Sequence, residues 1–477
     1  MGTTITVPKW WVTVDGVNRA GALFLVAAVI TSCGHSTPPP VTTTAAAVPT
    51  PTTAAPPPPP AITPAEFAPI AELVNADIAD HRLPGAVVLI GHDGQIVYRQ
   101  AFGDRKLPGE PGLDGRPAPA EPMTTDTIFD LASMTKALAT TTAIMQLHEQ
   151  GRIEFDEPVQ EYLPGFNPTG DPRRAQVTIR MLLTHTSGIG GDLSMQGPWG
   201  LNPADNAAGI HLAEISSLEF PPGEGFHYND INFILLGEIL EQITGQPEDE
   251  YVAEHVFGPL GMTDTRYLPP AKACGPHHVR GTATAPDQGA PQPADCPPGS
   301  WSTDLLTRIA PTALDEDNQA DPRLNPDFGQ PLRGTVHDPT ARRLGGVSGN
   351  AGVFSTADDV GRFAQALLDR RAGRASPFPL TQSSVLTMTT PQQPGNIADQ
   401  RGFGWDIDTP LSGPRGLVFP VGSFGHTGFT GVSLWLDPGS DTYVVVLSNV
   451  IHQRGGPPIT RLAGQVATAA GRALGLG

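Results

Sequence analysis

The chain has 477 residues, enough for one large domain or two ordinary ones. Only 16% of the residues are charged, while 54 are Gly and 52 are Pro, a composition that indicates a loop-rich globular protein and excludes a coiled coil. With 29 basic and 48 acidic side chains the formal net charge is −19, so no nucleic-acid partner is expected.

The N-terminal segment has the features of an export signal. Lys9 and Arg19 precede an apolar run over residues 20–30, which is too short to span a bilayer. The run leads into Ile30-Thr31-Ser32-Cys33, and this sequence resembles the lipobox of bacterial lipoproteins, in which cleavage before the Cys leaves it lipidated. The alternative is an ordinary signal peptide with an incidental Cys.

Residues 36–65 contain no charged side chain and are rich in Pro, Thr and Ala. Such a segment buries too little surface to fold and is expected to be an extended tether. We therefore predict a lipoprotein-type signal peptide at 1–32, the lipidated Cys33 with its linker at 33–64, and a folded domain at 65–477. The lipid would hold that domain at the extracytoplasmic face of the cell membrane.

Two β-hairpins are predicted near opposite ends of the folded part. Residues 85–91 and 96–103 are rich in β-formers and flank an Asp-Gly turn, and residues 431–436 and 442–448 flank Asp437-Pro438-Gly439. Between them the periodicity is mainly helical. The predicted helices cover residues 130–150, 230–244 with Gly245 as C-terminal cap, and 458–474. We expect an α+β fold with an antiparallel sheet from both chain ends, flanked by helices, and an inserted, mainly helical subdomain.

The predicted helix over residues 130–150 carries Lys136, one of four lysines in the chain, on an otherwise apolar stretch. Burial of an unpaired ammonium is costly, so this lysine is expected to be paired or held neutral. Ser133 lies three residues earlier on the same helical face. We interpret Ser133 as a nucleophile and Lys136, with a lowered pKa, as its general base.

Two further segments supply candidate site residues. Tyr228 precedes a predicted helix and can relay a proton to a leaving group. Asp230 is either the N-cap of that helix or a residue that faces substrate, or both. His426-Thr427-Gly428 precedes the last hairpin and offers a cationic or hydrogen-bonding ring, a hydroxyl and a close backbone approach. The Phe429 and Ser133 amides would then form an oxyanion hole.

The three motifs, in this order, resemble the serine β-lactamase and penicillin-binding-protein superfamily, in the branch of class C β-lactamases, D-alanyl-D-alanine carboxypeptidases and related esterases. The resemblance covers about residues 65–475 and extends to the strings MLLTHTSGIG, PLGMTDTRY and RGTVHDPTARRLGGVSGNAGVFSTADD, at residues 181–190, 259–267 and 333–359. It implies that Ser133 is acylated, with Lys136 as base, Tyr228 as relay and residues 426–428 as a substrate-binding box.

The chain departs from the superfamily pattern at three positions. Asp230 stands where the commonest second motif, Tyr-x-Asn, has Asn, and a carboxylate cannot donate to a substrate carbonyl. His426 replaces a Lys, a variant that resembles the carboxypeptidase side. Asn350 stands where relatives often have His.

Cys274 and Cys296 remain as two cysteines in an exported chain, so a disulfide between them is one expectation and two free thiols the other. Several histidines, such as His337 and His452, lack metal-ligand spacing, and neither a metal nor a cofactor is expected.

The leading hypothesis is a lipid-tethered serine hydrolase that forms an acyl-enzyme on cell-wall peptide, amide or ester bonds, so its substrate is a small molecule or peptidoglycan-derived. A β-lactamase or carboxylesterase would use the same catalytic residues. The rival class is a non-catalytic penicillin-binding module, which would need neither Ser133, Lys136 nor Tyr228.

Overall fold

The computed structural model describes residues 64–287, 289–452 and 458–477. The predicted signal peptide, the predicted lipidation site at Cys33 and nearly all of the predicted linker lie outside these residues. Among the helices in the described ranges, none combines the length and the hydrophobicity needed to cross a bilayer.

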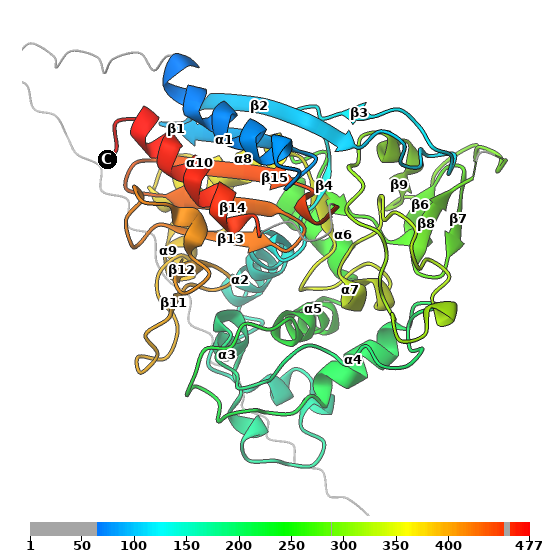
Figure 1. Cartoon of the computed structure of the whole chain (residues 1–477). Coiled ribbons are helices and arrows are strands. Elements are labelled where there is room, and N and C mark those ends of the chain that lie inside the picture. The colour runs from blue at the N-terminus through cyan, green and yellow to red at the C-terminus, as the bar shows by residue number, and fades with distance from the viewer. Residues whose placement is uncertain (1–63, 288, 453–457) are drawn as a thin grey trace, which may run out of the picture. The chain divides into compact units, whose positions relative to one another are not determined.

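One antiparallel sheet of eight strands brings the two ends of the folded part together (Figure 1), as the sequence predicted. Strand β1 lies between β2, its hairpin partner, and β15, the last strand of the chain, with Val88 opposite Val446 and Gln100. The strand order is β11-β12-β13-β14-β15-β1-β2-β3. Their bounds are β1 Gly85–His92, β2 Gln95–Lys106, β3 Glu121–Pro122, β11 Gln400–Arg401, β12 Asp406–Asp408, β13 Phe424–Gly428, β14 Val432–Asp437 and β15 Thr442–Ser448.

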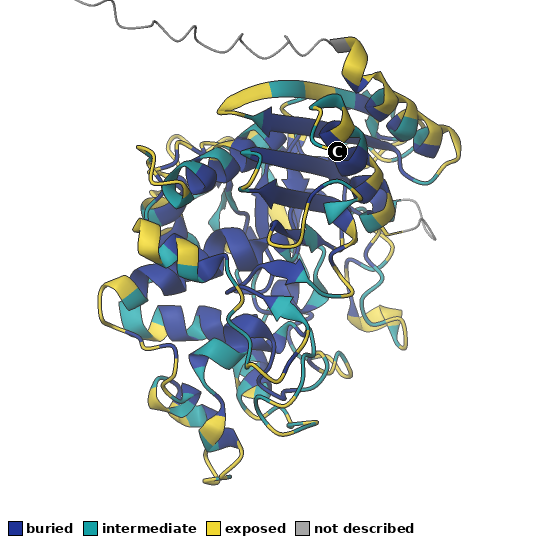
Figure 2. Ribbon diagram, turned by 90° about the vertical axis from the view of Figure 1, so that its left-hand side faces the viewer, coloured by how far each residue is buried: buried dark blue, intermediate teal, exposed yellow. Residues whose placement is uncertain are grey.

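Both faces of the central strands are covered, which explains why β1 is apolar throughout (Figure 2). Ala86, Val88 and Ile90 pack with α1 (Ala68–Ala79) and α10 (Thr460–Ala473), which lie side by side on one face. Val87 and Leu89 point to the opposite face and join the larger hydrophobic core, to which α2 (Thr142–Glu149) and α8 (Ala357–Arg371) contribute.

The segment between the two hairpins is mainly helical, and its described residues also form three small sheets apart from the main sheet. The helices there, besides α2 and α8, are α3 Ile179–Thr184, α4 Asn206–Glu214, α5 Ile231–Thr244, α6 Glu248–Val252, α7 Pro339–Arg343 and α9 Gln382–Met388. The short strands are β4 Phe129–Asp130, β5 Arg266–Tyr267, β6 Ala273–Cys274, β7 His277–Arg280, β8 Ala283–Pro286, β9 Trp301–Ser302 and β10 Val353–Ser355. The predicted fold class is thus confirmed, and Gly245 ends α5 in the left-handed conformation, with φ of +71°.

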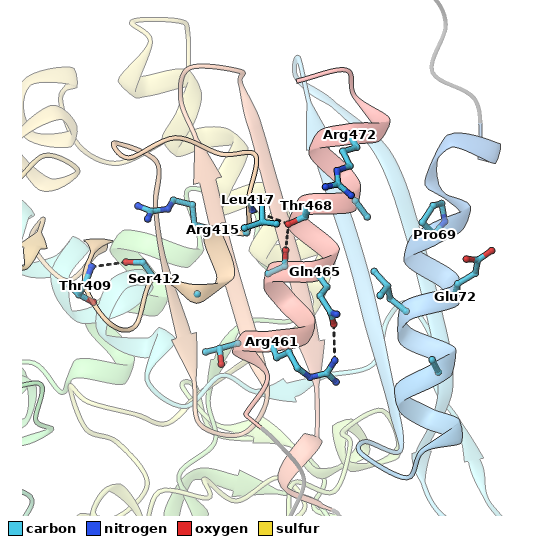
Figure 3. A pocket seen from close by; sticks show the side chains of 17 residues that line it. Pro69, Glu72, Thr409, Ser412, Arg415, Leu417, Arg461, Gln465, Thr468 and Arg472 are labelled. Carbon is cyan, nitrogen blue, oxygen red and sulfur yellow. Dashed lines mark hydrogen bonds between the residues drawn. The ribbon is translucent and has the colours of Figure 1, made fainter. Parts of the chain in front are cut away.

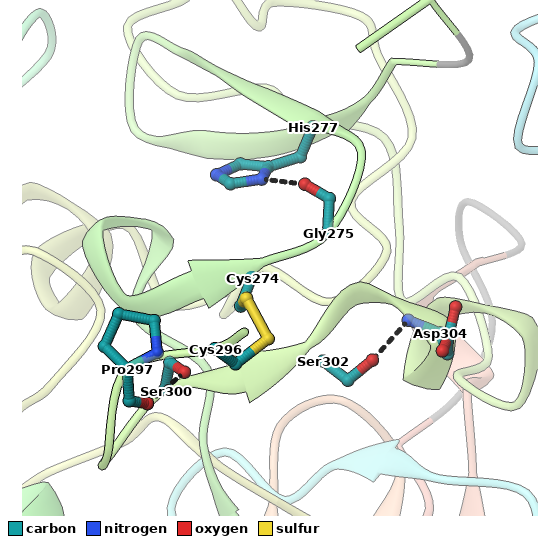
Figure 4. Close-up of a disulfide and its surroundings, with 8 residues drawn as sticks. All are labelled: Cys274, Gly275, His277, Cys296, Pro297, Ser300, Ser302 and Asp304. Atoms are coloured by element: carbon teal, nitrogen blue, oxygen red, sulfur yellow. Dashed lines mark hydrogen bonds between the residues drawn. A yellow bond between two sulfur atoms is a disulfide. The ribbon is translucent and has the colours of Figure 1, made fainter. Parts of the chain in front are cut away.

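Cys274 and Cys296 form a disulfide in the structure, with their Cα atoms 5.8 Å apart (Figure 4). Cys274 ends β6, which pairs in parallel with β9. The bridge therefore closes the segment 274–296, which contains the hairpin of β7 and β8.

The helix predicted from residue 130 begins later. Residues 129–130 pair with β10 as strand β4, and the regular helical hydrogen bonding begins only after Ser133. The reason is tertiary: Asp130 accepts hydrogen bonds from Ala132 N at 2.8 Å and from His337 N at 2.7 Å, so its side chain fixes a turn before the helix.

Candidate active site

Ser133 lies on a tight turn between strand β4 and the buried helix that continues into α2. Ala132, directly before it, has a φ of +44°, a left-handed conformation that is unusual for a residue other than glycine. Such strain persists only where surrounding contacts impose it. Here Asp130 holds the turn, and Lys136 N donates to Ser133 O at 3.1 Å to begin the helix. The turn therefore presents Ser133 at the N-terminal end of the helix.

Lys136 is fully buried and directs its ammonium at Ser133. Nζ donates to Ser133 Oγ at 2.9 Å, to Asp230 Oδ1 at 2.6 Å and to the backbone oxygen of Asn350 at 3.0 Å. An ammonium has three hydrogens, and these three acceptors use all of them. The geometry is that of a charged lysine with a complete set of partners.

The expectation of a lowered pKa for Lys136 is wrong. Burial by itself lowers the pKa of this lysine, but the carboxylate of Asp230 and the neighbouring Tyr228 outweigh it, and the pKa of Lys136 is raised above its usual value. In this state Lys136 is an ammonium that stabilises charge near Ser133. It cannot accept the serine proton until it has given up its own.

Asp230 does not cap helix α5 with its side chain, so the capping interpretation is wrong for this residue. The cap comes from the preceding residue: Asn229 Oδ1 accepts from Asn232 N at 3.0 Å. Asn229 is buried and also donates from Nδ2 to Ile189 O at 2.9 Å. Because its side chain does not cap the helix, the Asp230 carboxylate can form the ion pair with Lys136. Asp230 does not line the cavity described below.

The Tyr228 ring packs near two cations and on a buried histidine. Lys136 Nζ is 5.2 Å from the ring centroid, and the Arg401 guanidinium carbon is 5.9 Å from it. The ring centroid of His185 lies 4.4 Å from that of Tyr228, and His185 Nδ1 is within 3.3 Å of Asn229 N. This packing fixes the Tyr228 ring beside two positively charged side chains.

Strand β13 carries the predicted box of residues 426–428 beside the serine turn. A Cβ at Gly428 would lie 2.4 Å from Leu131 O and 3.1 Å from Ala132 Cβ, so only glycine allows this approach. Thr430 Oγ1 donates to Asp130 O at 2.7 Å and ties the end of the box to the same turn.

His426 is neutral in the structure, so of its two predicted roles the cationic one is excluded. Burial lowers the pKa of His426 to about 3, and the nearby charges of Arg401 and Lys136 act in the same direction. Nδ1 lies 2.7 Å from Thr427 O, which can only accept, so Nδ1 carries the proton and Nε2 is left as an acceptor.

A cavity of about 190 Å³ brings these segments together. Its walls include the predicted residues Ser133, Tyr228, His426, Thr427 and Phe429. Four further residues in the wall had not been singled out from the sequence: Arg401, Asp406, Leu411 and Trp435. Of these, Arg401 had a weak signal, as a charged residue directly before the apolar, glycine-rich run 402–405.

A larger hollow of about 1030 Å³ lies elsewhere, between α1, α10 and the short 3-10 helix η10, Gly413–Arg415 (Figure 3). Glu72 on α1 and Arg461 and Arg472 on α10 lie along it. None of the predicted catalytic residues lines this hollow. The smaller cavity is therefore the candidate active site.

No group of three or more His, Cys, Asp or Glu side chains in the described ranges is placed to hold a metal ion. His337 stacks on Phe429, with ring centroids 5.9 Å apart, and His452 Nε2 lies 2.8 Å from Glu110. These histidines have packing and hydrogen-bonding roles.

Comparison with known proteins agrees with this geometry. The beta-lactamase family model matches residues 70–467 of the chain. A protein of Escherichia coli (strain K12) named "Putative D-alanyl-D-alanine carboxypeptidase" is 30% identical over 379 residues, 77% of this chain and 79% of the relative. The N-acetylmuramyl-L-alanine amidase of Bacillus subtilis (strain 168) is 30% identical over 391 residues, 80% of each chain.

Solved structures share the fold at lower identity. The hydrolase EstCE1, described as having promiscuous acyltransferase activity, gives a TM-score of 0.59 at 23% identity, over 85% of this chain and 98% of its own. The octameric penicillin-binding protein homologue from Pyrococcus abyssi gives a TM-score of 0.57 at 21% identity, over 86% of this chain and 77% of its own.

Proposed function

The chain belongs to the beta-lactamase family and is a serine hydrolase, and from this premise we propose that it cleaves cell-wall peptide or amide bonds through an acyl-enzyme on Ser133. We further propose that it does so outside the cytoplasm, held to the membrane by lipid on Cys33. The observation that carries the catalytic proposal is the 2.9 Å contact between Lys136 Nζ and Ser133 Oγ, at the wall of a cavity that Tyr228 and His426 share.

The proposed reaction has two steps. Ser133 Oγ forms a bond to the substrate carbonyl carbon, the carbon–nitrogen bond breaks, and the serine proton passes through Tyr228 to the leaving amine. Water then attacks the acyl carbon, the bond from that carbon to Ser133 Oγ breaks, and Ser133 takes up a proton from the attacking water. Lys136 remains an ammonium and stabilises the negative charge that Tyr228 carries during transfer.

Proton transfer through Tyr228 replaces the predicted role of Lys136 as base. It follows from the complete set of hydrogen-bond acceptors around the Lys136 ammonium, which leaves Nζ no lone pair. Tyr228 is the hydroxyl-bearing side chain that shares the cavity wall with Ser133 and lies close to the ammonium.

The cell-wall substrate is supported by the names of the relatives, a D-alanyl-D-alanine carboxypeptidase and an N-acetylmuramyl-L-alanine amidase. β-Lactam and ester hydrolysis need the same serine, and the shape of the cavity decides among them. A direct comparison of a D-Ala-D-Ala peptide, nitrocefin and a short p-nitrophenyl ester ranks these activities.

Covalent labelling tests the acyl-enzyme. A fluorescent penicillin or fluorophosphonate should label the wild-type protein at the peptide that contains Ser133, and Ser133→Ala should abolish both labelling and turnover. Labelling that persists at another serine would contradict the assignment. Binding of penicillin without covalent labelling, with Ser133 intact, would favour the non-catalytic penicillin-binding module.

The anchor is tested separately. Cys33→Ala in the full-length chain should move the protein from the membrane fraction to the soluble secreted fraction, because it removes the acceptor of the lipid. Unchanged partitioning into detergent would show that Cys33 carries no anchor.

A further inference from the structure

Tyr228 lies on a segment whose shape depends on contacts with other parts of the chain. Residues 225–229 belong to neither a helix nor a strand, and they lead into helix α5. A side chain that transfers a proton must be held within hydrogen-bond reach of the reacting atoms, and a small displacement is costly for the rate. The contacts that hold this segment therefore bear on the role of Tyr228.

His185 contacts this segment on both sides of Tyr228. The His185 backbone oxygen accepts from His227 N at 2.9 Å, and its ring Nδ1 accepts from Asn229 N at 3.3 Å. The His185 ring also packs on the Tyr228 ring, with the ring centroids 4.4 Å apart and an angle of 35° between the planes. One residue thus holds the two flanking peptide N–H groups and the side chain between them.

The His185 ring is neutral, and its hydrogen bonds fix which nitrogen carries the proton. Burial, with the charges of Arg401 and Lys136 nearby, holds the pKa of His185 well below its usual value. The Nδ1 atom faces two donors, Asn229 N and Asn232 Nδ2, the second at 3.2 Å. Nδ1 therefore keeps its lone pair as an acceptor, and the proton is on Nε2.

Two features of His185, which follows the last residue of helix α3, cost stability. His185 has a φ of +57°, a left-handed conformation that glycine adopts more easily. Its Nε2 is buried without a hydrogen-bond partner, a cost that an apolar side chain would avoid. A glycine would end α3 equally well, but it would offer neither a ring for Tyr228 nor an acceptor for Asn229 N. Both costs are explained if the position requires that ring and that acceptor.

We propose that His185 is a positioning residue, which holds Tyr228 in the orientation that delivers a proton to the leaving group. This role rests on the proposed function, in which Tyr228 passes the serine proton to that group. His185 does not line the active-site cavity, so it acts on the reaction through Tyr228. A displaced Tyr228 should slow most the substrates whose leaving group cannot depart without a proton.

Two esters of the same acid separate this effect from a general loss of activity. The p-nitrophenyl ester releases a phenolate that departs without a proton, whereas the benzyl ester releases an alkoxide that must be protonated as it leaves. The measured quantity is the ratio of kcat/KM for the benzyl ester to kcat/KM for the p-nitrophenyl ester. Tyr228→Phe, which removes the hydroxyl, should lower this ratio by at least about 100-fold.

His185→Ala removes the ring and the acceptor, and it should lower the ratio by at least about tenfold. His185→Asn should give a ratio between those of His185→Ala and wild type, since its amide oxygen can take the place of Nδ1. Asparagine also adopts the left-handed conformation more readily than most residues. With Tyr228→Phe already present, His185→Ala should cause no further fall of the ratio, because both substitutions act on the same proton transfer.

Thr186→Val is the matched control. Thr186 is buried one residue after His185, and its hydroxyl lies 2.9 Å from that of Thr184. The substitution removes a buried hydrogen bond from the same turn and keeps the contacts of His185 with residues 227–229. It should therefore lower stability and leave the ratio at its wild-type value.

An unchanged ratio in the two His185 variants, even with lower activity on both esters, would overturn the proposal, because such a loss describes a general weakening of the fold. An equal fall of the ratio in Thr186→Val would overturn it as well. Where His185→Ala does not fold, His185→Asn decides alone, and a wild-type ratio in that variant overturns the proposal. Failure of the proposed function is distinct, since Tyr228→Phe itself would then leave the ratio unchanged.

Discussion

Two residues of the helix that begins after Ser133, one turn apart, each contact a carboxyl group from elsewhere in the chain. The two carboxyl groups differ in their partners and in their charge. Lys136 faces Asp230, and the two form an ion pair at 2.6 Å beside the active-site cavity. Thr140, four residues on, faces Glu248, which is 1% exposed and lies 2.7 Å from the Thr140 hydroxyl. The first carboxyl has a cation as its partner, and the second lies against the neutral hydroxyls of Thr140 and Tyr267.

The hydrogen bonds around Thr140 and the burial of Glu248 together favour a protonated Glu248. Thr140 Oγ1 lies 2.7 Å from Glu248 Oε1 and 2.7 Å from Gly349 O, and a hydroxyl has one hydrogen. That hydrogen can point to only one of the two oxygens, and when it points to Gly349 O, which can only accept, the contact with Glu248 Oε1 needs a hydrogen from Glu248. Burial raises the pKa of Glu248 to about 8, in agreement with this geometry. The carboxylate of Asp230 thus stays charged beside the active-site cavity, whereas the carboxyl of Glu248, one helical turn further on, is neutral.

Loss of the Lys136 charge should have the largest effect. Lys136→Ala is expected to lower kcat/KM on any substrate by at least about 10³-fold, or roughly 4 kcal/mol, because catalytic residues that act together fail together. Steady-state hydrolysis of a p-nitrophenyl ester measures it. A loss below about tenfold would show that the ammonium is not needed.

Removal of the other half of the ion pair should destabilise the protein. Asp230→Asn leaves a buried ammonium without its counter-charge, so we expect a loss of up to about 3 kcal/mol in the free energy of unfolding at pH 7. Because the Asp230 carboxylate raises the pKa of Lys136, the pair contributes its full stability below pH 10.5. The pKa of Lys136 falls in the variant, so the deficit should narrow as the pH rises toward 10, as urea unfolding at pH 7 and 9.5 would show.

Asn229→Ala separates this effect from helix capping. The substitution removes the hydrogen bond to Asn232 N and leaves the ion pair in place, with an expected loss of about 2 kcal/mol from the cap and the buried amide contacts. That loss should be the same at both pH values. If the loss of stability in Asn229→Ala depended on pH, or if Asp230→Asn left the free energy of unfolding unchanged, the interpretation of Asp230 as the helix cap would be supported instead.

The same comparison separates the features that could be predicted from the sequence from those that depend on tertiary contacts. Ser133 and Lys136 lie three residues apart on an apolar helix, and the strands of each predicted hairpin are neighbours in the chain, so local spacing was enough to find them. Asp230 lies 94 residues from Lys136, and the buried, unpartnered nitrogens of Arg401 follow from tertiary packing alone. The late start of the helix depends on Ala132, whose left-handed conformation has no signal because alanine, unlike glycine, does not favour it.

Glu248→Gln probes the neutral half of the comparison, and at neutral pH it should stabilise the protein, whereas the substitutions above should destabilise it. Since the pKa of Glu248 is raised from 4.5 to about 8, the folded protein holds a proton that the unfolded chain releases between these values. The native state therefore loses stability as the pH rises through this window, by up to about 1.4 kcal/mol per pH unit.

Glutamine keeps the shape and the donor of the protonated acid but does not titrate. The variant should therefore have the same stability as wild type near pH 4, be more stable at pH 7, and show the largest gain in stability at pH 8. Thermal unfolding across this range measures the difference. Equal pH dependence in the two proteins would mean that Glu248 is ionised in the fold, and the hydrogen-bond argument at Thr140 would then be wrong. Glu238→Gln, on the partly exposed side of α5 where the carboxylate accepts from Gln242 Nε2 at 2.7 Å, serves as the control and should keep the large loss of stability between pH 4.5 and 8.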